Sequence, residues 1–189
     1  MSSPYVELHT HSGFSFLDGA SHPEELVLMA QDLGYPALAL TDHNGLYGSM
    51  EFARAAKEAG IQPITGAEVS IDPGTVPGLE GYGLDLRRNG AIRDQRGAGL
   101  RHRDAELYSL PADHELVAPD IGFHLTLLAE TPEGYANLCR LLTQAHMEAE
   151  DRRNPLLPFP ALMDPERARG LILLTGCSRS PLWTALRDS

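Results

Sequence analysis

Residues 36–71 read PALALTDHNGLYGSMEFARAAKEAGIQPITGAEVSI, and this stretch decides the predicted fold. Its apolar run 36–40 is typical of a buried strand, and a helical pattern over 46–59 follows, which Gly60 ends. The runs 61–65 and 69–71 then predict strand structure on either side of Gly-Ala-Glu. Because strand, helix and strand follow one another, the stretch indicates a parallel α/β sheet or barrel.

The same alternation extends on both sides of this stretch. Upstream, residues 5–8 are a short β-type run, and Ser21 to Glu24 have the Ser-x-x-Glu form of a capping box, which predicts a helix that stops near Gly34. Downstream, the pattern predicts further elements in this order: a strand at 123–129, a helix from Thr131 to about Ala149, a strand at 171–174, and a helix that begins near Pro181.

Residues 72–119 interrupt this alternation. They are rich in Gly, Arg and Asp and show little periodicity. A structureless segment of this length in a compact domain is usually a functional loop or disordered, and we interpret it as a long mobile insertion. The alternative is that it contains a short hairpin.

Composition sets the broad class. The 189 residues suit a single domain, 1–189, with a sizeable core, and the sequence has neither the pattern of a signal peptide nor an apolar run that could cross a membrane, so we expect a cytoplasmic protein. The formal charge of −11 argues against wrapping around a nucleic-acid duplex, but not against a deep site that holds a phosphodiester through cations. Two cysteines are too few for a disulfide scaffold. Cys139 falls on an apolar helical stripe with Tyr135, Leu138 and Leu142, and we expect it in the core.

Potential metal ligands occur at consecutive strand ends. His9 and His11 close the first strand and share a face, His43 closes the second, and Glu68 lies at the third. Asp18 follows in the first loop. Each alone has an ordinary reading as a strand, turn or cap residue, but together imidazoles and carboxylates suit Zn²⁺, Mn²⁺ or Fe²⁺.

The motifs HTHSGFSFLDGA, ALALTDHNGLYG, GAEV, FHLTLLAETPEGYANL and GLILLTGC, in this order, closely resemble the PHP (polymerase and histidinol phosphatase) domain. They are most similar to the PHP domains of bacterial DNA polymerase III alpha subunits, especially of the error-prone type. The resemblance implies a distorted (β/α)₇ barrel with up to three divalent metal ions at its carboxyl end.

The resemblance also implies a ligand set: His9, His11, Asp18, His43, Glu68, His124 and Cys177. From spacing alone His124 is a cross-strand polar residue, so only the resemblance makes it a ligand. Cys177 follows a later strand, and from the sequence alone it is a buried thiol or a metal ligand. The remaining histidines keep ordinary roles: His22 in a helix cap, His102 and His114 in the insertion, and His146 on an exposed helix face.

One departure from the family concerns its final Asp-x-His motif, which should follow Cys177 and does not occur in the sequence. We therefore expect a fragment of a longer polymerase or a short stand-alone protein. In both cases the barrel would be incomplete at its C-terminus, with an open sheet edge that invites dimerisation or pairing with another chain.

The expected activity is hydrolysis of DNA phosphodiesters at 3′ ends, a 3′→5′ exonuclease reaction with metal-activated water, in replication or repair. Two alternatives remain open. The domain can be inactive, with a structural or partner-binding role toward other polymerase domains or subunits. It can also be a stand-alone small-molecule phosphatase, against which the polymerase-like FHLTLLAETPEGYANL argues.

Overall fold

The computed structural model describes residues 5–79, 122–150, 153–176 and 180–187. The elements follow in this order: α1 (Pro23–Asp32), β1 (Ala37–Leu40), α2 (Ser49–Ala59), β2 (Gln62–Asp72), a 3₁₀ turn η1 (Pro73–Thr75), β3 (Phe123–Ala129), α4 (Pro132–Glu148), β4 (Leu157–Pro158), α5 (Phe159–Met163), α6 (Pro165–Ala168), β5 (Leu171–Leu174) and α7 (Pro181–Arg187). The mixed α/β class is as predicted. No helix in the described part of the chain is long and apolar enough to span a membrane.

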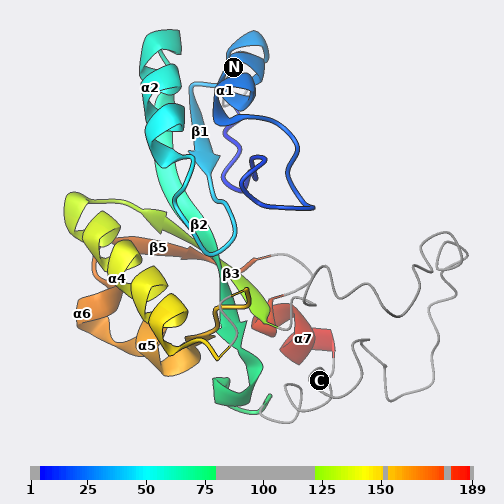
Figure 1. Cartoon of the computed structure of the whole chain (residues 1–189), viewed down its shortest axis with the longest axis vertical. Coiled ribbons are helices and arrows are strands. Elements are labelled where there is room, and N and C mark those ends of the chain that lie inside the picture. Colours follow the sequence, from blue (N-terminus) through cyan, green and yellow to red (C-terminus); the bar gives the residue numbers. More distant parts are fainter. Residues whose placement is uncertain (1–4, 80–121, 151–152, 177–179, 188–189) are drawn as a thin grey trace, which may run out of the picture.

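The long strand β2 joins two parts of the molecule (Figure 1). Its first half, Gln62–Thr65, pairs in parallel with β1, and the stretch from Gly66 to Ile71 pairs with β3. One apolar cluster packs α1 and α2 against β1 and includes Val27, Leu40, Phe52 and Ile61. The second packs α4 against the other strands and includes Val69, Ile71, Leu127, Leu138 and Leu141. The sheet order is β1-β2-β3-β5, with β4 on β2.

The prediction of parallel strands is wrong for β3, which runs antiparallel to both β2 and β5. A buried strand in either direction gives the same apolar sequence, so the run 123–129 cannot reveal its direction. Within the described residues the sheet is open, and a closed barrel stays a prediction.

Several element boundaries differ from those predicted. Residues 5–8 form no regular strand, although Glu7 bridges Leu38 at the edge of β1. The helix cap is His22 rather than Ser21, and the His22 N–H donates to Glu25 Oε2 at 2.8 Å. The helix predicted over 46–59 begins at Ser49, and the residues between α4 and β5 include short elements that the sequence did not suggest.

The interpretation of 72–119 as an insertion without regular structure is wrong for its beginning. Residues 73–75 form η1, and Val76 and Leu79 are buried against the second cluster. The Asp72 side chain accepts a hydrogen bond from the Gly74 N–H at 2.9 Å and so caps this turn. The remainder of the predicted insertion, together with His102 and His114, lies outside the described residues.

Helix α4 carries the buried stripe Leu138, Leu141, Leu142 and Ala145. The helix opens at Thr131–Pro132 as predicted, and the Thr131 hydroxyl caps it by accepting from the Gly134 N–H at 3.0 Å. Cys139 and Tyr135 lie to one side of this stripe and are partly exposed, so the prediction of a core cysteine is wrong. The buried stripe has the helical spacing 138, 141, 142 and 145. Cys139 is not part of this spacing, so its side chain lies at the border of the buried face.

Candidate metal centre

The carboxylate of Glu68 lies at the centre of a group of histidines. Glu68 is in β2, is 2% exposed, and its N–H donates to the carbonyls of Thr41 and Asp42. Its Oε1 is 2.5 Å from His124 Nδ1 and 3.3 Å from His43 Nδ1, and its Oε2 is 2.5 Å from His9 Nε2. Three imidazoles therefore approach one buried carboxylate.

The reversal of β3 explains how His124 reaches this site. In the antiparallel register Ser70 lies opposite His124 and Glu68 opposite Thr126, so Glu68 and His124 are diagonal neighbours on one face. The beginning of an antiparallel strand lies beside the carboxyl end of its neighbour. A residue at the head of β3 thus meets residues that follow parallel strands, which spacing alone could not indicate.

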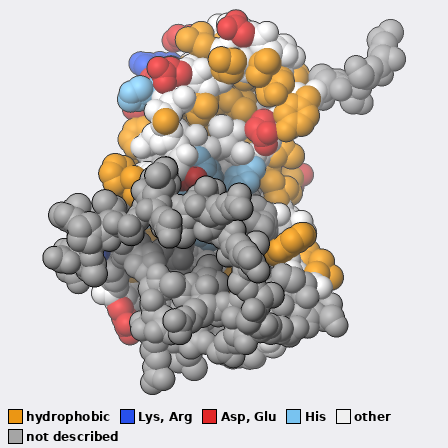
Figure 2. All heavy atoms as spheres, turned by 90° about the vertical axis from the view of Figure 1, so that its right-hand side faces the viewer, with side chains coloured by type: hydrophobic (Ala, Val, Ile, Leu, Met, Phe, Trp, Pro, Cys, Tyr) orange, Lys and Arg blue, Asp and Glu red, His pale blue; other side chains and the backbone are white. Residues whose placement is uncertain are grey.

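Asp18 joins two further histidines at the outer side of the site. Its Oδ2 is 2.7 Å from His11 Nδ1 and 2.9 Å from His43 Nε2, and its side chain is 56% exposed. The His11 ring lies 4.4 Å from the His43 ring and 4.9 Å from the His9 ring. Six residues thus form one cluster: His9, His11, Asp18, His43, Glu68 and His124. Histidine side chains are visible in the middle of one face in Figure 2.

The structure thus brings together six of the seven residues expected as ligands. Cys177, the seventh, lies outside the described residues. His22 is at the helix cap as predicted. His146 is not on an exposed face: it is half-buried, and its Nε2 donates to the Asn44 carbonyl at 2.8 Å.

Sequence reasoning missed the residues that hold the loop after His43. Asn44 has a left-handed φ of 49°, and its side chain bonds to both the N–H and the hydroxyl of Ser70 at 2.9 Å. Asparagine tolerates this conformation better than most residues. An asparagine directly after the Asp-His pair was therefore the signal in the sequence for a left-handed residue in this loop. It was also missed that the buried Asp42 accepts hydrogen bonds from Ser12 and Ser15.

The charges of the cluster depend on one another. Burial acts to raise the pKa of Glu68, but the hydrogen bond with His124 and the contact with His9 outweigh it and hold the pKa well below its usual range. The hydrogen bond with His43 likewise lowers the pKa of Asp18, against the effect of burial. Burial, followed by repulsion from His43, lowers the pKa of His11, whereas the contact with Glu68 raises that of His9.

The donor atoms fit divalent metal ions. They form three sets whose ligand atoms lie within 4.8 Å of one another: His9, His11 and Glu68; His11, Asp18 and His43; and His43, Glu68 and His124. Among the described residues, the buried atom His11 Nε2 has no hydrogen-bond partner, and Glu68 Oε2 lies 3.8 Å from it. Imidazole nitrogens that converge with carboxylate oxygens on a common point are what a metal site requires.

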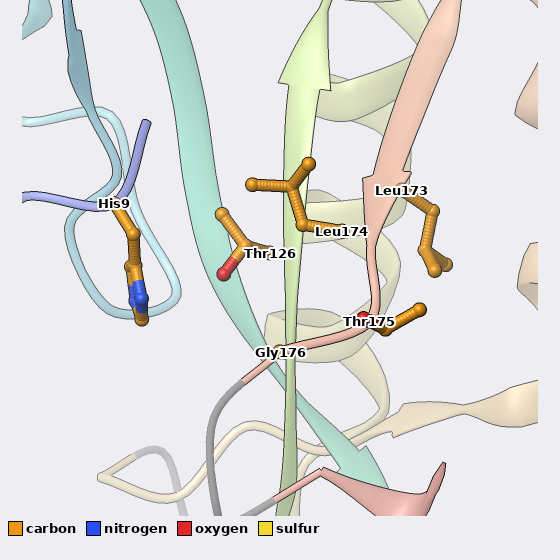
Figure 3. Close-up of a pocket in the computed structure, with 6 residues that line it drawn as sticks. All are labelled: His9, Thr126, Leu173, Leu174, Thr175 and Gly176. Carbon is orange, nitrogen blue, oxygen red and sulfur yellow. The ribbon is translucent and has the colours of Figure 1, made fainter. Parts of the chain in front are cut away.

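A hollow of about 410 Å³ adjoins the cluster on the side of His9. Figure 3 shows His9 on one side and the end of β5 on the other, and the remaining lining residues are Thr126, Leu173, Leu174, Thr175 and Gly176. The hollow therefore offers space directly beside a candidate ligand.

Comparisons with known proteins identify relatives of this chain. It is 41% identical to an error-prone DNA polymerase of Nocardia farcinica, with 98% of this chain and 16% of that protein covered. It is 32% identical to the DNA polymerase III subunit alpha of Mycobacterium tuberculosis, with 98% and 14% covered. A crystal structure from Bifidobacterium adolescentis, of a protein provisionally designated a metal-dependent phosphoesterase, aligns with a TM-score of 0.43 at 18% identity and covers 77% of this chain and 34% of that one.

The chain spans only about a sixth of the length of the curated relatives it matches. The model of the PHP domain family matches residues 7–189, which includes every residue of the cluster. The chain belongs to the PHP domain family.

Proposed function

We propose that this chain is the metal-dependent phosphoesterase domain of an error-prone DNA polymerase and hydrolyses phosphodiesters at DNA 3′ ends. The observation that carries the proposal is the convergence of His9, His43 and His124 on the buried carboxylate of Glu68. A structural ion pair needs only one partner for a carboxylate, whereas three imidazoles around it are typical of ligands that share ions.

The six residues of the cluster would hold the ions, with Cys177 as a further ligand. Divalent ions bound there would lower the pKa of a bound water molecule and would place positive charge beside the phosphate oxygens. Glu68 and Asp18 would remain ionised near neutral pH because histidine contacts lower their pKa values. The hollow beside His9 would accept the substrate next to the ions.

The chain's acidic character fits this arrangement. With a formal charge of −11, it would not attract DNA over its whole surface, so the positive charge of the ions would have to provide the attraction locally. We therefore expect binding of a strand end at the cluster rather than along a duplex.

The test is hydrolysis of a 3′-end-labelled oligonucleotide in Mn²⁺ or Zn²⁺. We expect the His9→Ala/His11→Ala double variant to lose at least about 100-fold in rate, because removal even of groups around a metal ligand costs ~10–100-fold. His22→Ala is the matched control, since His22 caps α1 outside the cluster. Equal rates for the wild type and the double variant would contradict the proposal.

A second candidate function is a structural role that binds other polymerase domains or subunits. Exposed apolar side chains on β5 and α7 favour it, among them Ile172, Leu173 and Trp183. Strong stabilisation by metal without hydrolysis of DNA or of a phosphate monoester would support this role. Turnover of the monoester alone would instead indicate a small-molecule phosphatase.

A further inference from the structure

A second buried carboxylate lies directly behind the cluster and belongs to none of its three ligand sets. Asp42 is 2% exposed and precedes His43 in the chain. Its Oδ1 accepts from the Ser12 N–H at 2.7 Å and from the Ser15 hydroxyl at 2.6 Å, and its Oδ2 accepts from the Ser12 hydroxyl at 2.7 Å. Both serines are buried as well.

The direction of these hydrogen bonds is fixed by the neighbouring backbone. The Ser12 hydroxyl accepts from the Phe14 N–H at 3.3 Å, and the Ser15 hydroxyl accepts from the His43 N–H at 3.1 Å. Each hydroxyl has one proton, which is therefore directed at Asp42. Both oxygens of Asp42 act as acceptors, and an amide in its place would turn an NH₂ group toward a proton donor.

The network connects the backbone of His43 to the loop that carries Asp18. Ser15 does this twice, since its hydroxyl accepts from the His43 N–H and its carbonyl accepts from the Asp18 N–H at 3.0 Å. Glu68 and His124 are placed differently, by the ladder between β2 and β3. The inner residues Glu68 and His124 therefore have a support in this ladder that does not depend on the Asp42 side chain.

We propose that Asp42 is a positioning residue that sets the spacing of His11, Asp18 and His43. We call this set the outer metal subsite. Loss of Asp42 releases the loop and empties the outer metal subsite, while the ion held by His43, Glu68 and His124 remains. The inference rests on the proposed metal binding by the cluster.

The experiment counts Mn²⁺ ions bound per chain by equilibrium dialysis of the full chain. We expect Asp42→Asn to bind one ion fewer than the wild type, or to bind that ion at least ~10-fold more weakly. Amide hydrogen exchange of the metal-free variant should be faster at residues 12–19 and unchanged in β2. Faster exchange of this loop without loss of an ion would contradict the proposal.

Asn137→Asp is the matched control because it makes the reverse swap in another buried network. The Asn137 amide donates to the carbonyls of Glu166 and Arg169 at 3.0 and 2.9 Å, and Asn137 is a buried residue of α4. This variant should lose stability yet bind as many ions as the wild type. If it lost the same ion, the effect of Asp42→Asn would be general destabilisation and the proposal would be wrong.

Ser15→Ala provides a milder change should Asp42→Asn fail to fold. It removes one of the two hydroxyls and should weaken the same ion. If the wild type binds ions and both variants bind them equally well, this inference alone is contradicted. A wild-type chain that binds no ion contradicts the proposed function and this inference together.

Discussion

Glu68 keeps a negative charge at a depth where burial alone would favour the protonated acid. Its contacts with His124 and His9 reverse that tendency and lower its pKa. Glu68→Gln removes the charge but keeps the shape, so the neighbouring imidazoles lose their shared anion. We expect metal affinity to fall by more than the ~10–100-fold caused by loss of an outer-sphere partner.

Isothermal titration with Mn²⁺ measures this change. Glu58→Gln is the control, since Glu58 is an exposed carboxylate on α2. Unchanged affinity in Glu68→Gln would show that Glu68 binds no ion.

The same carboxylate gives the metal-free chain an acid-sensitive stability. The pKa values of Glu68 and Asp18 are lowered from ordinary values of 4.5 and 3.8, so their contribution is fully present above those values and is lost as pH falls toward the lower folded values. Urea unfolding between pH 7 and pH 3 should show the free energy of unfolding declining below about pH 4.5. The decline should be shallower in Glu68→Gln, and parallel curves would contradict this assignment.

At the scale of elements, the loop 12–19 depends on a close backbone approach. A Cβ at Gly19 would lie 1.9 Å from the Ser12 carbonyl oxygen, so Gly19→Ala must displace either Asp18 or the Ser12 backbone. We expect a loss of ~1–3 kcal/mol in the free energy of unfolding, typical of overpacking, together with weaker metal binding at the outer metal subsite.

Gly13→Ala is the control within the same loop, because its nearest atoms would be 3.6 Å from the new Cβ. Thermal unfolding in the presence and absence of Mn²⁺ measures both effects. If the two variants behave alike, the loop does not depend on this contact.

The elements also show how far sequence alone reaches. The helix cap at Thr131, the strand at 123–129 and the stop at Gly60 were predictable, because capping and glycine in a left-handed conformation are local effects. Proximity of His9, His11, His43 and Glu68 was also expected from the sequence. The expected reason was only partly right, because residues 5–8 form no regular strand and Glu68 lies inside the continuous strand β2 instead of after a strand.

What could not be predicted depends on contacts between distant residues. The direction of β3 leaves no trace in its own sequence, so His124 could be assigned only through family resemblance. The role of Asp42 could not be recognised because its partners, Ser12 and Ser15, are about 30 positions away in the sequence. The half-buried His146 likewise depends on a carbonyl at Asn44, which no helical periodicity can indicate.

At the scale of the whole molecule, the cluster lies between the two apolar parts. Segments around β1 contribute His9, His11 and His43, beside the apolar cluster that contains Phe52. Strand β3 contributes His124, beside the apolar cluster that contains Leu138. β2 is the continuous strand through both parts, and it contributes Glu68. Ions shared among these ligands would therefore link the two parts in a second place.

Removal of the metal should therefore change which segments open first, as well as the temperature at which the molecule unfolds. At a free ion concentration 100 times Kd, binding to the native state adds about 2.7 kcal/mol to the free energy of unfolding. Chelation removes this term, and it also removes the link between the two clusters. We expect the metal-free chain to show a lower and broader thermal transition, with hydrogen exchange increasing most at residues 7–18 and 41–44. The Glu68→Gln variant should already behave in this way with Mn²⁺ present, and a uniform increase in exchange across both clusters would contradict a linking role for the ions.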